Sequence, residues 1–419
     1  SLDSDGTVAD IGTYPYLNSY SGPTWYVQTA GNDTSGTGAS ANPFSSIQAA
    51  INFATTAGDS VTVAAGTYAE NINFRGRNIK VVGEDRETTI IDGNQSGTVV
   101  EIINGEDSTT IFSDFTIQNG FNTSTPWPAG HGGGIFVTLA DPQLRNLIIR
   151  NNEANFGGGG YFYEYEGTIE NIIVNDNTGE GLRLQYSNAI IHNAFIENNT
   201  AQYGPGVNLE GSTVIIVGST ISANTANAEG GGIYLWNNSS LSIENSIITG
   251  NSSDIAGGGI RSQNSNITLT NCKISGNIAT TGGGIYGEYG IIRNSEITNN
   301  SAGYAGAISG EFALINCTVA NNASTSGNYS VEFSNNSTDK YIMNSIFYGN
   351  TPDSISIWTD MEISYSNVEG GLNVMMTQQP IWGSGNIDVD PMFVDTANGD
   401  YTLQMDSPLI DTGHPDSTD

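Results

Sequence analysis

Aromatic, charged and amide side chains recur at two positions of a repeated segment, just after a run of glycines. In GGGIYLW (230–236) the two positions are Tyr234 and Trp236, which flank an apolar residue. Alternate residues of a β-strand point to opposite faces, so these two are expected to point away from the core. Sugar rings stack on aromatic side chains, and sugar hydroxyl groups pair with carboxylates, amides and guanidinium groups. The pattern predicts a glycan-binding face whose candidate residues are Arg183, Tyr234, Trp236, Arg261, Tyr286 and Glu288.

An ordinary solvated sheet face is the alternative interpretation of these positions. In such a face, aromatic and mixed polar residues pack on their counterparts in neighbouring strands without binding a ligand. The same alternation after the glycines predicts the outward residues of every copy of the repeat. In GGGGYFY (157–163) it places Phe162 at the first outward position.

Cleavage of a polysaccharide at this face would need a particular set of groups. A uronate lyase needs a base and a cation that stabilises the developing charge. Arg183 and Arg261 stand three repeats apart, about 14 Å in a stacked sheet, which is too far to share one sugar carboxylate. A glycosidase needs two carboxylates roughly 5–10 Å apart, and Glu288 and Glu311 stand at the same position of neighbouring repeats. Because acidic residues are abundant, such a pair is expected by chance, and no catalytic residue is assigned.

Acidic residues near both ends of the chain suggest metal binding. Asp3, Asp5 and Asp10 in DSDGTVAD have the D-x-D-G character of calcium loops, which place hard oxygen ligands around a glycine turn. The full EF-hand pattern is absent from this stretch. Asp388 and Asp390 in NIDVDP are further candidates. The predicted cofactor is Ca²⁺, and the alternative is that these are polar turn residues.

The balance of charge excludes some classes of partner. The 419 residues contain 43 acidic and 11 basic side chains, a net charge of −32 that repels phosphate backbones. No stretch is apolar for about 18 residues, so no membrane span is expected. The two cysteines, Cys272 and Cys317, form no disulfide framework and are expected to be inert core residues.

An internal repeat in the sequence predicts the secondary structure that positions the glycan-binding candidates. Each copy closes on an asparagine, and the steps between these asparagines vary between 22 and 28 residues. A second asparagine stands six residues earlier, replaced by Gly218 in one copy, and the apolar residues alternate as in strands. Such a repeat is one coil of a parallel β-helix, in which identical residues stack about 4.8 Å apart. The predicted structural asparagine ladder is Asn152, Asn177, Asn199, Asn224, Asn251, Asn277, Asn300, Asn322 and Asn350.

The chain resembles the right-handed parallel β-helices of the pectate-lyase-like superfamily over nearly its whole length. Residues 25–93 resemble the N-terminal segment of secreted β-helix proteins, in which a short helix, here 43–57 with Ser45 or Ser46 as N-cap, covers the core. Residues 385–413 resemble the closing segment of bacterial cell-surface β-helix proteins. The resemblance implies an all-β solenoid of about a dozen rungs, right-handed and extracellular. The expected segments are 1–24, 25–93, 94–370 and 371–419.

The two ends of the sequence resemble two parts of one closing motif. In relatives, SPLIDTG is followed by an acidic stretch, D-x-D-G-T-x-x-D-I-G and an aromatic residue. This chain ends in SPLIDTGHPDSTD and begins with SLDSDGTVADIGTYPY. We expect one period of a tandem array in a longer chain, or a subunit that docks head to tail in a filament. The alternative is a sequence boundary unrelated to the fold, or an N-terminal strand that folds back within one chain.

Two functional hypotheses follow from these expectations. The first is a non-catalytic extracellular or cell-surface module with a structural or adhesive role, whose partners are copies of itself and a polysaccharide. The alternative is a polysaccharide lyase or glycoside hydrolase that acts on an acidic polysaccharide at the outward face of the post-glycine strands.

Overall fold

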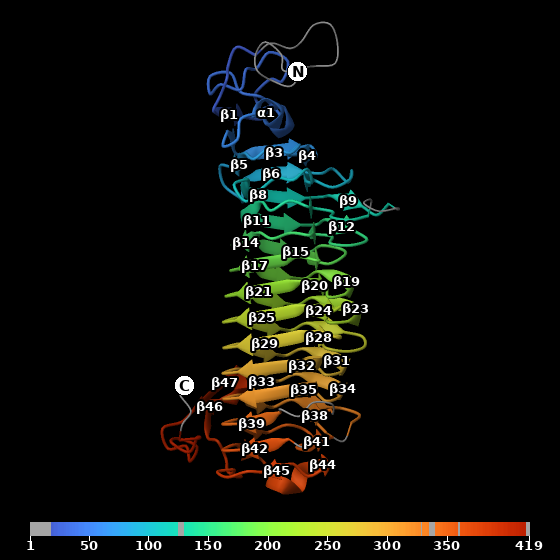
Figure 1. The fold of residues 1–419 in the computed structure, drawn as a ribbon, viewed down its shortest axis with the longest axis vertical. Helices are drawn as coiled ribbons and strands as arrows, with labels where there is room; N and C mark the ends of the chain where they lie inside the picture. The colour runs from blue at the N-terminus through green and yellow to red at the C-terminus, as the bar shows by residue number, and fades with distance from the viewer. Residues whose placement is uncertain (1–17, 125–129, 328, 335–339, 359–360, 416–419) are drawn as a thin grey trace. The chain divides into compact units, whose positions relative to one another are not determined.

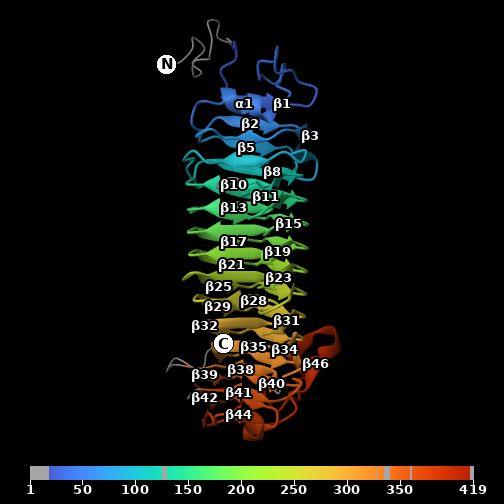
Figure 2. The ribbon, with the colours of Figure 1, turned by 90° about the vertical axis from the view of Figure 1, so that its right-hand side faces the viewer.

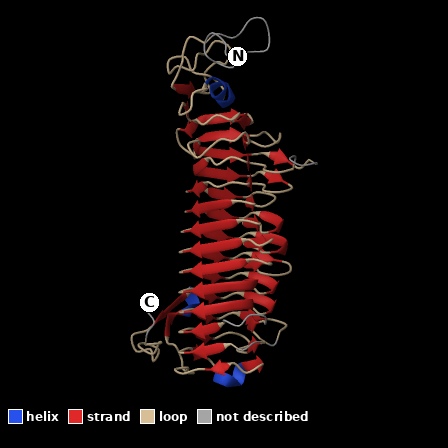
Figure 3. Ribbon diagram, viewed as in Figure 1, coloured by secondary structure: helices blue, strands red, loops and turns tan. Residues whose placement is uncertain are grey.

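The computed structural model describes residues 18–124, 130–327, 329–334, 340–358 and 361–415. The chain is mostly β, a solenoid of about 12 turns, and its described residues include one short α-helix near the N-terminus (Figures 1 and 3). This confirms the predicted fold class. Two compact units make up the chain, Ser1–Phe195 and Ile196–Asp419. Among the described residues, no helix has the length and apolarity needed to cross a membrane.

Unit 1 is built from three walls of parallel strands around an apolar interior. The first wall contains β4 (Ile72–Asn73), β7 (Val100–Ile102), β10 (Ile135–Thr138), β13 (Gly160–Tyr163) and β16 (Leu182–Gln185). The second contains β1 (Thr24–Val27), β2 (Ser60–Val63), β5 (Lys80–Gly83), β8 (Ile111–Gln118), β11 (Gln143–Arg150), β14 (Thr168–Glu170) and β17 (Asn188–His192). The third contains β3 (Gly66–Ala69), β6 (Thr89–Asp92), β15 (Ile173–Asn175) and the ends of β8 and β11. Outside the walls, β9 (Phe121–Asn122) pairs with β12 (Glu153–Ala154).

The predicted N-terminal helix is α1, Ile47–Phe53, in unit 1. Ser46 is its N-cap, and the Ser46 side chain accepts a hydrogen bond from the Ala49 N–H at 3.3 Å. The Glu70 carboxylate accepts from two further N–H groups of the first turn, and burial raises its pKa against the effect of these bonds. Stacked rings at 5.2 Å join Phe53 to the buried Phe44, so the helix covers apolar surface at this end of the unit.

Unit 2 has three walls and a fourth, narrower sheet, all parallel. The post-glycine wall contains β20 (Val207–Glu210), β24 (Ile233–Trp236), β28 (Ile260–Ser262), β32 (Ile285–Arg293), β35 (Ile308–Ile315), β38 (Val331–Phe333), β41 (Ile355–Ile357) and β44 (Met375–Thr377). The second wall contains β21 (Thr213–Val217), β25 (Ser240–Glu244), β29 (Asn266–Thr270), the ends of β32 and β35, β39 (Tyr341–Met343), β42 (Glu362–Ser364) and β45 (Ile381–Trp382). The third contains β22 (Thr220–Ser222), β26 (Ile247–Thr249), β30 (Lys273–Ser275), β33 (Glu296–Thr298), β36 (Thr318–Ala320), β40 (Ile346–Tyr348) and β43 (Asn367–Val368); β18 (Phe195–Glu197) spans the division between the units. The narrow sheet contains β19 (Thr200–Tyr203), β23 (Thr225–Glu229), β27 (Ser252–Ser253), β31 (Ile278–Thr281), β34 (Ser301–Tyr304) and β37 (Ala323–Ser324).

The end of unit 2 turns back along its own coils (Figures 1 and 2). After the 3₁₀ helix η1 (Gly371–Val374), the chain forms an antiparallel pair, β46 (Phe393–Asp395) and β47 (Asp400–Leu403), joined by η2 (Thr396–Asn398). The Lys273 ammonium donates to the Gly399 carbonyl at 2.9 Å. The Tyr401 hydroxyl accepts from Asn321 Nδ2 at 2.9 Å, so the returning chain is bound to the side of the coils.

A ladder of buried asparagines closes the coils of unit 2 at the turn between the third wall and the narrow sheet. In each step the side-chain oxygen of one asparagine accepts two hydrogen bonds, from the backbone N–H and the Nδ2 of the asparagine one coil earlier. Both distances are 3.0 Å for Asn199 to Asn224, for Asn224 to Asn251 and for Asn251 to Asn277. The pattern continues through Asn300, Asn322 and Asn350. In unit 1, Asn152 makes the same pair of bonds to Asn177 at 3.0 and 3.1 Å.

The second column of asparagines, six residues before each ladder asparagine, has a different role. These residues stand at turns with a left-handed backbone conformation. Their φ angles lie between 47° and 54°, and Gly218 has φ 61° at the same position of its coil. Asparagine and glycine tolerate this conformation better than other residues, which explains the replacement. In unit 2 the next position carries serine or cysteine facing the interior, whereas unit 1 has Leu147, Ile172 and Ala194 there. Both cysteines are free and buried, and burial raises the pKa of the Cys317 thiol to about 12.

Candidate functional site

The glycan-binding candidates of unit 2 lie on the outward face of the post-glycine wall. The glycines before each strand are required by the backbone: Gly230 has φ 69°, and a Cβ there would lie 2.6 Å from the Ile233 oxygen. Strand pairing places Asn208, Tyr234, Arg261, Tyr286 and Ser309 in register as a first column. The pairing also sets Glu210 beside Trp236 in a second column.

The first column points outward but is not open to solvent, unlike the solvated sheet face of the alternative interpretation. Tyr234 is 7% exposed and Arg261 is 8% exposed. The strands of the narrow sheet precede the glycine turns and lie against these side chains. The Tyr203 ring contacts the Tyr234 ring at 5.3 Å, and Asn208 Nδ2 donates to the Tyr203 carbonyl at 3.2 Å. In this fold, pointing out of the core is not the same as facing water.

Arg261 is held on two sides by groups of its own unit. Its Nε donates to Glu229 Oε2 at 3.2 Å, and its guanidinium lies 4.4 Å from the centre of the Tyr286 ring. These contacts combine an ion pair with a cation–π interaction. The contact between Arg261 and Tyr286 therefore stabilises the pairing of the neighbouring strands β28 and β32.

Arg183 has a similar environment in unit 1. Its Nη1 donates to Glu180 Oε1 at 2.9 Å, and its guanidinium lies 4.9 Å from the centre of the Phe156 ring. The residue in register with Arg183 one coil earlier is Tyr161, since Phe162 pairs with Leu184 and is fully buried. The prediction that Phe162 points outward is wrong, because the fourth glycine of its copy already belongs to strand β13 and shifts the count by one.

The second column of the post-glycine wall is more open. Trp236, Gln263 and Glu288 are each half-buried. The Tyr234 hydroxyl donates to Gln263 Oε1 at 2.7 Å, which fixes the orientation of that amide. Glu288 Oε2 accepts from the backbone N–H of Asn264 at 2.9 Å. The column thus presents an aromatic ring, an oriented amide and a carboxylate on successive strands.

A β-bulge interrupts the wall at Glu288. Strand β32 pairs with β35 through Gly287 and Gly310, and the register then shifts before Gly290. Gly310 has φ 139°, and a Cβ there would lie 1.6 Å from the Gly287 oxygen, so only glycine fits. The ring of the buried Phe312 fills the space beneath the bulge. Bulges re-aim side chains and are frequent near active sites.

Glu311 directly follows Gly310 on β35, and its side chain forms an ion pair. Its Oε2 contacts Lys340 Nζ, and both side chains are under a tenth exposed. Burial lowers the pKa of Lys340, while the hydrogen bond to Glu311 acts in the opposite direction. Close by, Ser309 Oγ donates to Glu332 Oε2 at 2.6 Å. Sequence reasoning missed Lys340 and Glu332. Glu332 continues the first column beside Ser309, but its strand follows no run of glycines that would mark it in the sequence.

The metal candidates form no cluster in the described part of the chain. Asp3, Asp5 and Asp10 lie outside the described residues. Asp388 and Asp390 are exposed, and Asp390 Oδ1 accepts from the Met392 N–H at 2.8 Å. No three His, Cys, Asp or Glu side chains among the described residues are grouped so that they could hold a metal. Calcium binding at either end stays a prediction.

The chain belongs to the right-handed β-helix family. The family model described as "Right handed beta helix region" matches residues 88–248 and 205–369. No curated protein matches the chain. Among solved structures, pectate lyase Pel9A is 17% identical over 93% of this chain and 91% of its own, with a TM-score of 0.45.

Two further solved structures are similar at the level of the fold. The A-module of mannuronan C-5 epimerase AlgE4 from Azotobacter vinelandii is 16% identical over 73% of this chain and 88% of its own, with a TM-score of 0.36. Pectin methylesterase PemA from Erwinia chrysanthemi is 11% identical over 63% of this chain and 80% of its own, with a TM-score of 0.36. These structural neighbours are carbohydrate-active enzymes, and at such low identity the likeness is one of fold alone.

Proposed function

We propose that the protein is a glycoside hydrolase whose catalytic pair is Glu288 and Glu311. The observation that carries the proposal is the bulge, which sets these two carboxylates on neighbouring strands with unlike environments. Neighbouring strands lie about 4.8 Å apart. Carboxyl groups about 5–5.5 Å apart are typical of glycosidases that retain the anomeric configuration.

The environments assign the two roles. Glu311 contacts the Lys340 ammonium, and a carboxylate held beside a cation suits the role of nucleophile. Glu288 is half-buried and forms no ion pair among the described residues, and its Oε2 accepts a hydrogen bond from the Asn264 N–H at 2.9 Å. We assign it the remaining role, that of the general acid. Glu288 then protonates the leaving oxygen while Glu311 attacks the anomeric carbon. In the second step Glu288 activates the water that releases the sugar.

The rest of the second column supplies the binding surface. Trp236 lies two strands before Glu288, roughly 10 Å away by strand spacing, with Gln263 between them. A sugar chain that runs along this column stacks one ring on Trp236 and reaches the carboxylates with a later ring. The face carries carboxylates, so an uncharged polysaccharide suits it. The acidic polysaccharide expected from the sequence would need a bound cation such as calcium.

The experiment is a reducing-end assay on purified protein with neutral and uronate polysaccharides, each with calcium and with a chelator. Glu288→Gln and Glu311→Gln are each expected to lower turnover by about 10²-fold or more. Glu244→Gln is the matched control, since Glu244 is an exposed glutamate of the second wall. Trp236→Ala is expected to raise KM more than it lowers kcat. NMR of the first product should show a retained anomer.

The outcomes separate this proposal from the non-catalytic hypothesis. Polysaccharide binding that needs Trp236, without release of reducing ends, would overturn the hydrolase and support the extracellular structural or adhesive module. Cleavage that survives in Glu288→Gln would overturn the assignment of the pair. Unsaturated products from uronate polysaccharides would instead indicate a lyase. Calcium-dependent filaments seen by electron microscopy would support the head-to-tail partner expected from the sequence.

A further inference from the structure

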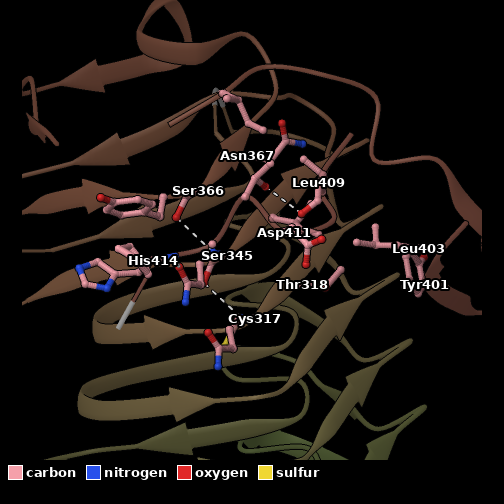
Figure 4. Close-up of a pocket in the computed structure, with 18 residues that line it drawn as sticks. Cys317, Thr318, Ser345, Ser366, Asn367, Tyr401, Leu403, Leu409, Asp411 and His414 are labelled. Atoms are coloured by element: carbon pink, nitrogen blue, oxygen red, sulfur yellow. Dashed lines mark hydrogen bonds between the residues drawn. The ribbon is translucent and has the colours of Figure 1, made fainter. Parts of the chain in front are cut away.

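A cavity of about 600 Å³ lies in unit 2 between the coils and the returning C-terminal chain, and it is not lined by the post-glycine wall. The coils contribute residues at the turn between the second and third walls, among them Asn316, Asn344 and Tyr365. The returning chain contributes Asp411 and His414 (Figure 4). Pockets of roughly 300–1,000 Å³ are the size that holds small ligands.

The column of left-handed asparagines meets the returning chain inside this cavity. In the column of left-handed asparagines, Nδ2 of one residue donates to Oδ1 of the residue one coil earlier, as from Asn316 to Asn294 at 3.1 Å. At the next coil, Asn344 Oδ1 accepts from the backbone N–H of His414 at 2.8 Å. Asn316 Oδ1 is left buried without a hydrogen-bond partner. A buried acceptor without a donor is costly unless a bound molecule supplies one.

The lining defines the chemistry of that molecule. It contains no lysine and no arginine, so an anionic ligand would meet only the negative charge of Asp411. The lining offers amides and hydroxyls, the Tyr365 and Tyr401 rings, and apolar side chains such as Leu403 and Leu409. The Tyr365 ring meets the His414 ring edge-on, with 4.7 Å between the ring centres. A polyhydroxylated ring offers hydroxyl donors to Asn316 Oδ1 and an apolar face to an aromatic ring. We propose that this cavity binds an uncharged sugar of one or two rings.

This proposal goes beyond the hydrolase, because the cavity and the catalytic pair lie on different walls. The tests are isothermal titration calorimetry and ligand-observed NMR with glucose, galactose, xylose and their disaccharides. Asn316→Gly removes the buried acceptor and suits the local φ of 54°. Asn171→Gly, at φ 53° in unit 1, is the matched control, and Gly218 shows that the fold accepts glycine at this position.

Binding of at least one of these sugars is expected, weakened about tenfold in Asn316→Gly and unchanged in Asn171→Gly. The Glu288→Gln protein should bind the same sugar as tightly as the wild type, which separates this site from the proposed active site. Failure of every sugar to bind would overturn the proposal. Equal affinity in the Asn316→Gly protein, confirmed as folded by its thermal transition, would also overturn it.

Discussion

Replacement of Asn277 by alanine tests the idea that the buried ladder holds the coils together. Asn277 Oδ1 accepts from Asn251 N and Nδ2, both at 3.0 Å. Its Nδ2 donates to the Ile248 carbonyl at 3.0 Å and to Asn300 Oδ1 at 2.9 Å. The substitution removes all four bonds in a place that water does not reach, since Asn277 is 0% exposed. At about 1 kcal/mol for each bond, the expected loss is about 4 kcal/mol of unfolding free energy.

The assay is urea denaturation followed by circular dichroism, together with amide hydrogen exchange. Exchange is informative because each coil of a solenoid contacts only its neighbours, so the loss should concentrate near residues 251–300. Asn271→Gly is the control: Asn271 sits at a left-handed turn with φ 54° and makes one side-chain bond, to Asn245 at 3.2 Å. The control should lose under about 1 kcal/mol. A loss in Asn277→Ala no larger than in the control would refute the reasoning.

Three further substitutions test the packing of unit 2. Gly310→Ala should lower stability by about 3 kcal/mol or more, measured as a fall in Tm, since its Cβ would lie 1.6 Å from the Gly287 oxygen. Arg261→Met should cost about 2–3 kcal/mol in urea denaturation, because it leaves Glu229, 22% exposed in its side chain, without its cation. The pKa of Cys317 is raised from 9.0 to about 12, so the stability it contributes is complete below pH 9 and is lost as pH rises toward 12. Denaturation of Cys317→Ala between pH 8 and 11 should show a shallower alkaline decline than the wild type.

The repeat could be predicted from the sequence because its constraints are local. A buried closing asparagine and a left-handed turn six residues earlier each accept few residue types, so they mark every coil. The exception supports the rule: Gly218 replaces asparagine where φ is 61°. The cysteines could be placed in the core for the same reason, since they occupy a position that serine holds in neighbouring coils.

The candidate site could be predicted only in part, because exposure depends on what covers a strand. The period of two gives the direction of Tyr234 and Arg261 but not the narrow sheet that buries them. Lys340 stands at no position of the repeat that was aligned from the sequence, so its ion pair with Glu311 could not be predicted. The bulge at Glu288 has the same origin: it arises from the space taken by the Phe312 ring, which is a packing effect.

Stacking of the coils brings acidic side chains of neighbouring strands close together, and several of them are paired with a cation. Strands about 4.8 Å apart place like charges close together unless a cation or an aromatic ring intervenes. Glu229 contacts Arg261, Glu296 contacts Lys273 at 3.1 Å, and Glu311 contacts Lys340. Glu288 lies at the bulge on the strand next to that of Glu311, with no cation of its own among the described residues. One carboxyl group with a cation and a neighbouring one without it form the asymmetric pair that glycoside hydrolysis needs, since one group attacks the anomeric carbon and the other transfers a proton.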